Sequence, residues 1–169
     1  MKKDKYIEYI LWILAIILLF PALFVNLGLM PLNFPSDEPT RAIVALEMMI
    51  SGDYIHPTIN GELYYNKPPL FNWIIIFFNK ITGNLSELTL RLPVTFSLLF
   101  YGLFIFLFTR KYYGNKTALL HALVFISCGR ILFWDSFIGL IDISFSMIIF
   151  MLFMSVFYFF RKEKYNSLS

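Results

Sequence analysis

The sequence predicts an all-α, polytopic membrane protein with about four transmembrane helices and two interfacial helices in the first outer loop. Of its 169 residues, 59% are hydrophobic and only 15% are charged. Several apolar stretches approach the roughly 20 residues that a helix needs to cross a bilayer. A water-soluble domain of this length cannot bury so many large apolar side chains, so that class of protein is excluded.

The apolar stretches give the bounds of the expected spans, which are 7–29, 88–108, 117–134 and 135–160. Pro21 is expected to kink the first span, because proline removes a backbone hydrogen bond from a helix. This first stretch is too long for the core of a signal peptide, and no small-residue cleavage site follows it. We therefore expect it to remain as a helix, with residues 30–87 forming an outer loop.

The positions of lysine and arginine residues predict how the chain is oriented in the membrane. They gather before the first span, between the second and third spans, and after the fourth span: Lys2, Lys3, Lys5; Arg110, Lys111, Lys116; Arg161, Lys162, Lys164. Cytoplasmic loops carry an excess of these residues. A four-span arrangement places all three clusters and both termini in the cytoplasm, and it places the long loop outside.

The first part of the outer loop has the pattern of a helix over residues 37–50. Ser36 or Asp37 is suited to cap its start, Pro39 lies in its first turn, and Gly52 is suited to end it. Apolar residues recur at helical spacing on one face: Ala42, Ile43, Leu46, Met49 and Ile50. We expect this helix to lie on the membrane surface or against the spans.

A second apolar segment, residues 70–78, is too short to cross a bilayer. Lys67 and Lys80 flank it, and aromatic residues that suit the headgroup region lie near it: Tyr64, Tyr65 and Trp73. These features predict a second interfacial or re-entrant helix.

Asp37 and Glu38 are adjacent carboxylates just outside the first span. They stand at the start of an expected helix, where the helix dipole favours negative charge. Two interpretations stay open from these residues: a simple helix cap, or a general base or metal ligand at the membrane surface.

Lys67 precedes Pro68 and Pro69. The two prolines stiffen the backbone and therefore fix where the lysine points. Its ammonium group either binds a lipid phosphate as a point charge or simply extends from an apolar surface towards the headgroups.

Two further carboxylates are expected in the fourth span. Asp135 and Asp142 are seven residues apart and would share a helix face, which places Asp142 about 10 Å from the start of the helix at about 1.5 Å per residue. Ionisable groups at that depth face a bundle interior or a wet cavity. We therefore expect a functional or pairing role for Asp142. Asp135 either caps the helix or acts at the site, and Arg130 is its expected partner.

Other chemistries find little support. The single Cys128 cannot form an internal disulfide or a cysteine metal site, and neither His56 nor His121 has a second ligand at suitable spacing. The chain shows no glycine-rich phosphate loop and no interleaved basic stripe, so we expect no nucleic acid partner.

The outer loop contains DEPTRAIVALEMMISGDYIHPTINGELYYNKPPLFNW. It resembles the amino-terminal portion of the polytopic lipid-linked-sugar glycosyltransferases, the aminoarabinose transferases and the protein-mannosyltransferase superfamily, of GT-C type. The resemblance depends on the order and spacing of four pieces: Asp37-Glu38, Ser51-Gly52-Asp53, Asn60-Gly61 and Lys67-Pro68-Pro69. It extends over nearly the whole chain.

Enzymes of that family move a sugar from a polyprenyl-phosphate carrier to an acceptor outside the cytoplasm. The resemblance implies that Asp37 is the catalytic base or binds a divalent metal, and that Lys67 contacts the carrier phosphate. Asp135 is the better match to the acidic residue at the outer start of span four, and Asp142 is the second candidate. The expected catalytic residues are Asp37, Glu38 and Asp135. The expected substrate-binding residues are Lys67, Arg41, Tyr65, Asp142 and Arg130.

The sequence departs from the family pattern in two places. The aminoarabinose enzymes carry Glu before Lys-Pro-Pro, a metal ligand in some members, where this chain has Asn66. They carry Arg three residues after the Asp, where this chain has Thr40 followed by Arg41. The metal, the sugar and the acceptor therefore stay open. Because family members have many more spans, the chain resembles an amino-terminal fragment, a truncated product or one half of a split enzyme.

We therefore expect a glycosyltransferase, or its amino-terminal part, in the bacterial inner membrane. Its expected partners are a polyprenyl-phosphate-linked sugar, membrane lipids and a downstream membrane half of the same enzyme, and a divalent metal is the cofactor that the resemblance allows. The alternative is a non-catalytic membrane protein that binds a polyprenyl phosphate or a partner protein. A small transporter has weak support, because four spans without an internal repeat offer little.

Overall fold

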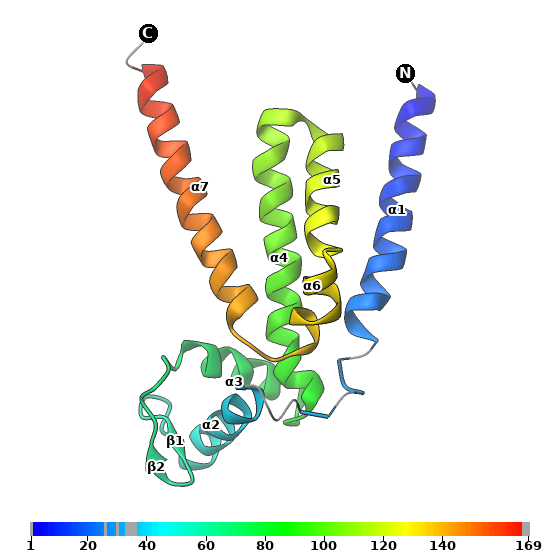
Figure 1. Ribbon diagram of the computed structural model, residues 1–169. Helices are drawn as coiled ribbons and strands as arrows, with labels where there is room; N and C mark the ends of the chain where they lie inside the picture. The colour runs from blue at the N-terminus through cyan, green and yellow to red at the C-terminus, as the bar shows by residue number, and fades with distance from the viewer. Residues whose placement is uncertain (1, 26, 30, 33–36, 167–169) are drawn as a thin grey trace.

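The computed structural model describes residues 2–25, 27–29, 31–32 and 37–166. Its elements, in chain order, are α1 (Lys2–Phe24), α2 (Glu38–Ser51), β1 (Thr58–Ile59), β2 (Glu62–Leu63), α3 (Leu70–Thr82), α4 (Glu87–Tyr113), α5 (Asn115–Ile126), α6 (Gly129–Phe133), the 3-10 helix η1 (Asp135–Phe137) and α7 (Asp142–Asn166). The axes of the long helices are roughly aligned, with α1 and α5 running opposite to α4 and α7, and α2, α3 and the hairpin form a layer at one end (Figure 1). Both ends of the chain and the α4–α5 turn lie at the other end, so the three basic segments share that end.

Local signals in the sequence set the bounds of α2. Pro39 lies in its first turn, and Gly52 ends it with a φ of 73°, a conformation that glycine adopts without steric cost. These bounds agree with those expected. The apolar face of the expected helix does not pack on the spans, however, since Ile43, Leu46 and Ile50 are exposed. The buried residues of α2 are Glu38, Arg41, Ala42, Val44, Ala45 and Met48.

Strands β1 and β2 form a small antiparallel hairpin in which Thr58 pairs with Leu63. Asn60 and Gly61 make its turn, both with positive φ, as a tight two-residue hairpin requires. Glu47 of α2 holds the hairpin through the Thr58 hydroxyl at 2.6 Å and the Asn60 amide at 2.6 Å. The hairpin is therefore fixed to α2.

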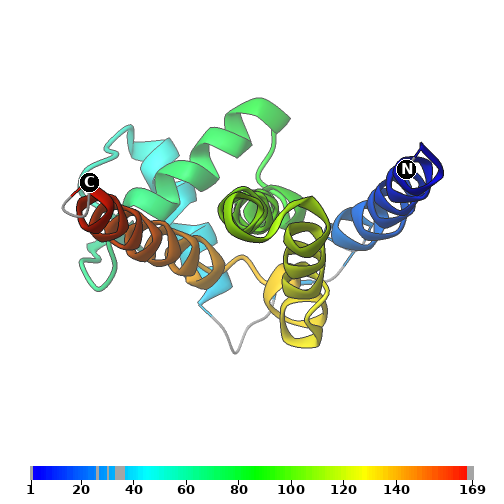
Figure 2. The same cartoon turned by 90° about the horizontal axis from the view of Figure 1, so that it is seen from above.

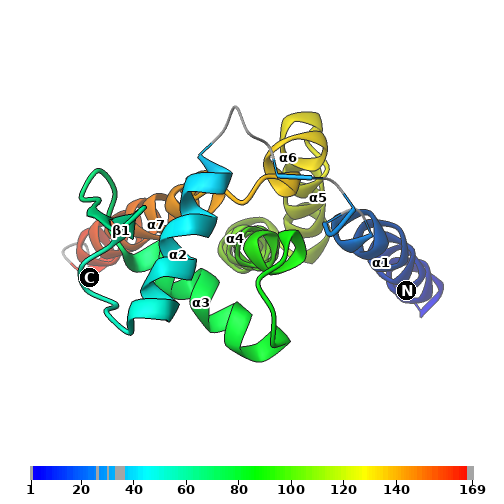
Figure 3. The ribbon, with the colours of Figure 1, turned by 90° about the horizontal axis from the view of Figure 1, so that it is seen from below.

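Helix α3 is four residues longer than expected, because its left-handed terminator is Gly83 and no earlier residue breaks the pattern. Lys80 therefore lies on the helix and does not flank it. Phe71, Ile75 and Ile76 are buried where α3 packs on α2 and α4. Seen from below, α2 and α3 lie to one side of the foot of α4 (Figure 3).

Two helices in the described part of the chain, α4 and residues 142–161 of α7, are long and apolar enough to cross a membrane. A third span results if α5 and α6–η1 are taken together across the 42° bend between them. The apolar part of α1, residues 12–24, is shorter. The all-α class is confirmed. The count of four spans and the location of both termini in the cytoplasm stay predictions. Viewed along the helices, α4 lies between α7 and the pair α1 and α5 (Figure 2).

Candidate functional site

The candidate site lies where the outer-loop layer meets the ends of the long helices. It comprises the first turn of α2, Lys67 ahead of α3, and the connector 138–141 ahead of α7. The connector approaches α2 because the amide of Gly139 donates to Glu38. Segments about 100 residues apart in the chain are thus brought together.

Glu38 and Arg91 form a buried ion pair at the centre of this junction. Arg91 Nε donates to Glu38 Oε1 at 2.7 Å, and Nη2 donates to Oε2 at 3.0 Å. Neither side chain is more than 1% exposed. Arg91 also donates to the carbonyl oxygens of Leu27 at 2.9 Å and Pro31 at 3.1 Å. The pair therefore joins the segment after α1, the start of α2, and α4.

Gly139 joins the same cluster from the connector. Its N–H donates to Glu38 Oε1 at 2.8 Å. A Cβ at this position would lie 3.1 Å from Glu38 Oε1 and 3.1 Å from the carbonyl oxygen of Leu90, tighter than most side-chain contacts. We call Glu38, Arg91 and Gly139 the buried cluster. A side chain at position 139 would therefore push against Glu38 and the backbone of α4.

Asp37, the neighbour of Glu38, has the opposite environment. Its side chain is 56% exposed and forms an ion pair with Lys67, whose side chain is 26% exposed. Asp37 occupies the N-cap position of α2, but its carboxylate makes no capping hydrogen bond. The interpretation of Asp37 as a helix cap is therefore wrong for its side chain. The structure instead pairs two residues that sequence reasoning assigned to the site separately.

Lys67 is held close to α2 by the prolines that follow it. Pro69 is the N-cap residue of α3, so Pro68 and Pro69 lead directly from the lysine into a packed helix. Because proline restricts its own backbone angle, the lysine stem starts from a defined position. The ammonium group is thus presented beside the first turn of α2.

Arg41 lies one turn after Asp37 and is buried. Its Nη1 donates to Asn72 Oδ1 at 3.4 Å, and its guanidinium lies 5.8 Å from the centre of the Phe71 ring. Burial lowers the pKa of Arg41, and the nearby Tyr64 and Asp142 oppose that shift. The residue therefore supports the packing of α2 on α3 and places positive charge towards the start of α7.

Asp142 does not lie inside the fourth span. It begins α7 and is exposed, while Asp135 lies on η1, with the non-helical connector between them. The expectation that the two share one helix face is wrong. The reason is the bond from Gly139 to Glu38, which holds the connector in a non-helical path. Asp142 reaches the site through its electrostatic interaction with Arg41.

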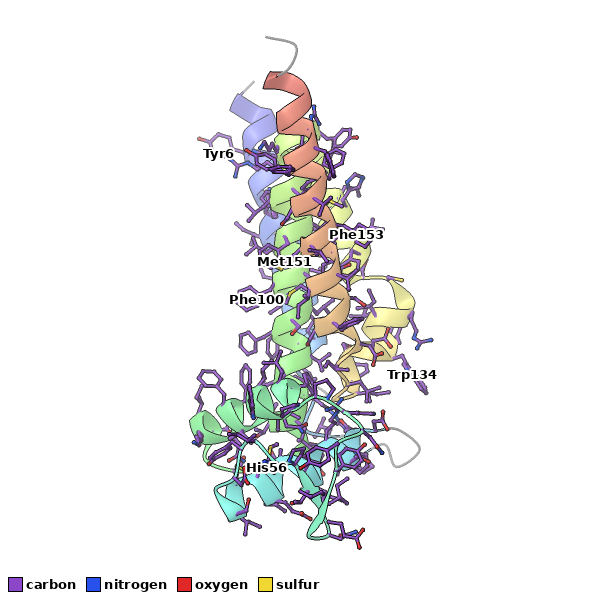
Figure 4. The ribbon with its side chains drawn as sticks, turned by 90° about the vertical axis from the view of Figure 1, so that its left-hand side faces the viewer. Tyr6, His56, Phe100, Trp134, Met151 and Phe153 are labelled. Atoms are coloured by element: carbon purple, nitrogen blue, oxygen red, sulfur yellow. The ribbon has the colours of Figure 1, made fainter. Side chains whose placement is uncertain are left out.

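Asp135 and Arg130 make the contact expected of them. Arg130 Nε donates to Asp135 Oδ1 at 3.1 Å, with the arginine side chain 71% exposed. Within the described residues, no contact joins this pair to Asp37 or Lys67. Trp134, next to Asp135, points away from the bundle (Figure 4). Tyr65 is 63% exposed and makes no hydrogen bond to a described site residue.

Sequence reasoning did not identify Arg91, Asn72 or Gly139. Arg91 could have been found, because an arginine near the start of an apolar span needs a buried partner. The signal in Asn72 was weaker, as a single amide on an amphipathic helix is common. The sequence alone gave no sign that Gly139 contacts Glu38.

The residues present do not fit a divalent metal at Asp37. Such an ion takes several oxygen or nitrogen ligands. Among the described residues, no three His, Cys, Asp or Glu side chains lie close enough to hold one. The Asp37 carboxylate pairs with Lys67 and the Glu38 carboxylate with Arg91. No step of the chemistry is therefore assigned to a metal.

An apolar cavity of about 300 Å³ lies between α1, α4 and α5. Its lining includes Trp12, Leu19, Leu23, Gly102, Phe106 and Ile126. Leu23 lies four residues before Leu27, whose carbonyl oxygen accepts a hydrogen bond from Arg91.

Comparison with known proteins connects this arrangement to one family. Residues 66–168 match the family described as dolichyl-phosphate-mannose-protein mannosyltransferase. An uncharacterized protein of Aquifex aeolicus is 35% identical over 118 residues, 69% of this chain and 23% of that protein. The undecaprenyl phosphate-alpha-4-amino-4-deoxy-L-arabinose arabinosyl transferase of Shewanella sediminis is 31% identical over 63% of this chain and 20% of its own length. The chain thus spans about a fifth to a quarter of these relatives.

Solved structures share the fold. The crystal structure of ArnT from Cupriavidus metallidurans bound to undecaprenyl phosphate matches 81% of this chain with a TM-score of 0.75 and 23% identity, over 25% of that protein. The same protein in the apo state matches 88% of this chain with a TM-score of 0.75 and 22% identity, over 26% of its length. These likenesses confirm the polytopic helical architecture. Since the family match extends over more than half of its residues, this chain belongs to the dolichyl-phosphate-mannose-protein mannosyltransferase family of lipid-linked-sugar glycosyltransferases.

Proposed function

We propose that this chain forms the catalytic front part of a glycosyltransferase that moves a sugar from a polyprenyl-phosphate carrier to an acceptor on the outer side of the bacterial inner membrane. The observation that carries the proposal is the ion pair between Asp37 and Lys67. A carboxylate and an ammonium group, 30 residues apart in the chain, meet at the end of the long helices opposite the two termini (Figure 1). Transfer from a phosphate carrier uses a base for the acceptor and a positive charge for the leaving phosphate.

The proposed chemistry is a direct displacement at the anomeric carbon of the sugar. The acceptor oxygen attacks this carbon, the bond from carbon to the phosphate oxygen breaks, and the polyprenyl phosphate leaves with the bonding electrons. Asp37 takes the proton of the acceptor hydroxyl or amine as a general base. Lys67 stabilises the negative charge that develops on the leaving phosphate.

The ion pair suggests how the two roles are coupled. In the free protein Lys67 forms an ion pair with Asp37. A carrier phosphate competes with Asp37 for the same ammonium group. Binding of the carrier therefore releases Asp37 towards the acceptor at the moment when a base is needed.

The remaining expected residues take different parts in this proposal. Glu38, expected to be catalytic, is a positioning residue, because its carboxylate is fully buried and both of its oxygens are bonded. Substrate-binding roles for Arg41 and Asp142 also stay predictions. Direct roles for Asp135, Arg130 and Tyr65 stay predictions.

The names of the relatives point to the donor class. The Shewanella sediminis relative is named for an undecaprenyl phosphate carrier and an aminoarabinose sugar. We take the same carrier as the first donor to test. Lipid A and outer-face proteins are the acceptor classes to test with it.

The test is sugar transfer by the purified chain in vesicles, with radiolabelled undecaprenyl-phosphate aminoarabinose as donor and lipid A as acceptor. Asp37→Asn should lower the rate by about 100-fold or more, the usual contribution of a general base. Glu62→Gln, which changes an exposed carboxylate on β2, serves as the matched control and should leave the rate unchanged. Full transfer by Asp37→Asn would overturn the assigned role.

The non-catalytic alternative draws support from the apolar cavity between α1, α4 and α5, which is suited to an isoprenoid chain. It predicts that the chain binds undecaprenyl phosphate and transfers no sugar to any acceptor. Binding measured beside transfer, on the same vesicles, separates the two functions.

A further inference from the structure

Helix α3 exposes an apolar stripe. Leu70, Trp73, Phe77 and Ile81 recur at helical spacing and are all exposed, with Phe77 at 59% and Ile81 at 65%. The buried residues Phe71 and Ile75 lie on the opposite face, against α2 and α4. The stripe therefore faces away from α2.

This stripe is continuous with the outward surface of α4. Phe77 contacts Phe78 edge to face at 5.6 Å, and Phe78 stacks on Phe96 of α4 at 5.3 Å. Phe100, one turn further along α4, is exposed and points away from the bundle (Figure 4). Phe96 is nine residues into α4, about 14 Å along the helix at about 1.5 Å per residue. Helix α3 thus packs beside the first part of α4, a helix long and apolar enough to cross a membrane.

A hollow of about 360 Å³ lies at the edge of the stripe, lined by Tyr54, Trp73, Ile76, Phe77 and Lys80. Trp73 Nε1 donates to the carbonyl oxygen of Tyr54 at 2.6 Å, which fixes the loop after α2 against α3. The Lys80 ammonium lies 5.2 Å from the centre of the Tyr54 ring. The hollow is therefore lined by three aromatic side chains and one cation.

Lys80 differs from Lys67 in its partners. Lys67 is neutralised by Asp37, whereas no carboxylate of the described residues lies within ion-pair distance of Lys80. An ammonium group beside tryptophan and tyrosine at the depth of the headgroups attracts anionic lipids. We propose that this hollow binds the phosphate headgroup of an anionic glycerophospholipid, such as phosphatidylglycerol, of the outer leaflet, with its acyl chains along the stripe. The site is separate from the proposed transfer site.

The test uses Trp73 as the reporter. The full chain carrying Trp12→Phe and Trp134→Phe is placed in vesicles of phosphatidylcholine that contain a fixed fraction of brominated phosphatidylglycerol or brominated phosphatidylcholine. Quenching of Trp73 by both lipids is expected, because the stripe lies in the bilayer. Phosphatidylglycerol should be preferred about five-fold, the factor that one lysine near the surface contributes.

In this background, Lys80→Gln should abolish the preference and keep the quenching by phosphatidylcholine, which also shows that the variant is folded. Lys116→Gln, at the opposite end of the molecule, should keep the preference. Three outcomes would overturn the proposal: equal quenching by both lipids in the parent, a preference that survives Lys80→Gln, or loss of the preference on addition of inorganic phosphate, which would indicate a site for a free ion.

Discussion

Asp37 and Glu38 are neighbours in the sequence, yet the structure gives them opposite environments. Glu38 is fully buried and bonds to Arg91 and to the amide of Gly139. Asp37 is mostly exposed and pairs with Lys67. Because successive residues of a helix point about 100° apart, adjacent carboxylates at a helix start face different sides. One carboxylate therefore joins the layer of α2 and α3 to the long helices, and the other is exposed beside Lys67.

The largest expected effect is on stability and comes from Glu38. Glu38→Gln leaves Arg91 buried without its counter-charge, which should cost about 3–5 kcal/mol of unfolding free energy. Asp37→Asn breaks an exposed pair and should cost less than about 1 kcal/mol. The measurement is chemical unfolding in detergent, followed by circular dichroism.

A second variant separates lost charge from lost packing at Glu38. Replacing both partners with apolar residues, as Glu38→Leu with Arg91→Met, should destabilise less than either single change, because no buried charge remains unpaired. Equal unfolding free energies for Glu38→Gln and Asp37→Asn would contradict the contrast between the two carboxylates.

The next effect concerns binding of the carrier. Lys67→Gln should weaken binding of undecaprenyl phosphate about ten-fold or more, since a hydrogen bond to a charged group contributes about 1.5–3 kcal/mol. Lys67→Arg, which keeps the charge, should retain most of the affinity. Lys116→Gln is the control at the opposite end. Unchanged affinity in Lys67→Gln would remove the lysine from the site.

Gly139 offers a smaller test of the buried cluster. Gly139→Ala places a Cβ 3.1 Å from Glu38 Oε1, and the resulting overpacking should cost about 1–3 kcal/mol. Gly129→Ala is a matched control, because nothing lies within 4 Å of a Cβ there. If both variants unfold alike, the connector does not depend on its approach to Glu38.

The smallest expected change in stability belongs to Asp135. Its pair with Arg130 is largely exposed, so Asp135→Asn should alter the unfolding free energy by less than about 1 kcal/mol. Sugar transfer by the same variant then reports on a direct role without interference from misfolding. A large loss of stability would show that Asp135 belongs with the buried contacts.

The helices of the outer loop could be predicted where the chain carries local signals. Pro39 and Gly52 mark the two ends of α2, and Gly83 would have marked the true end of α3. The bounds of the fourth long helix could not be predicted. Residues 135–142 look helical by hydropathy, but a hydrogen bond to Glu38, about 100 residues earlier in the chain, keeps the connector out of a helix.

In the site, too, some features could be predicted from local sequence, and others depend on contacts between distant segments. Asp37 and Lys67 could be identified because their spacing follows a known pattern, and the structure pairs them. Glu38 fitted that pattern equally well, and only the position of Arg91 shows that it is a buried structural group. Residue type and spacing therefore indicated which segment carries the paired charges. Which of the two adjacent carboxylates is buried and which is exposed depends on tertiary contacts.

The most direct test of this account measures carrier binding and sugar transfer by Asp37→Asn on the same vesicles. If Asp37 is the base and also competes with the carrier phosphate for Lys67, the variant should bind undecaprenyl phosphate more tightly than the parent. It should also transfer sugar about 100-fold more slowly or worse. If binding and transfer fall together, or if neither changes, Asp37 does not have the role proposed for it.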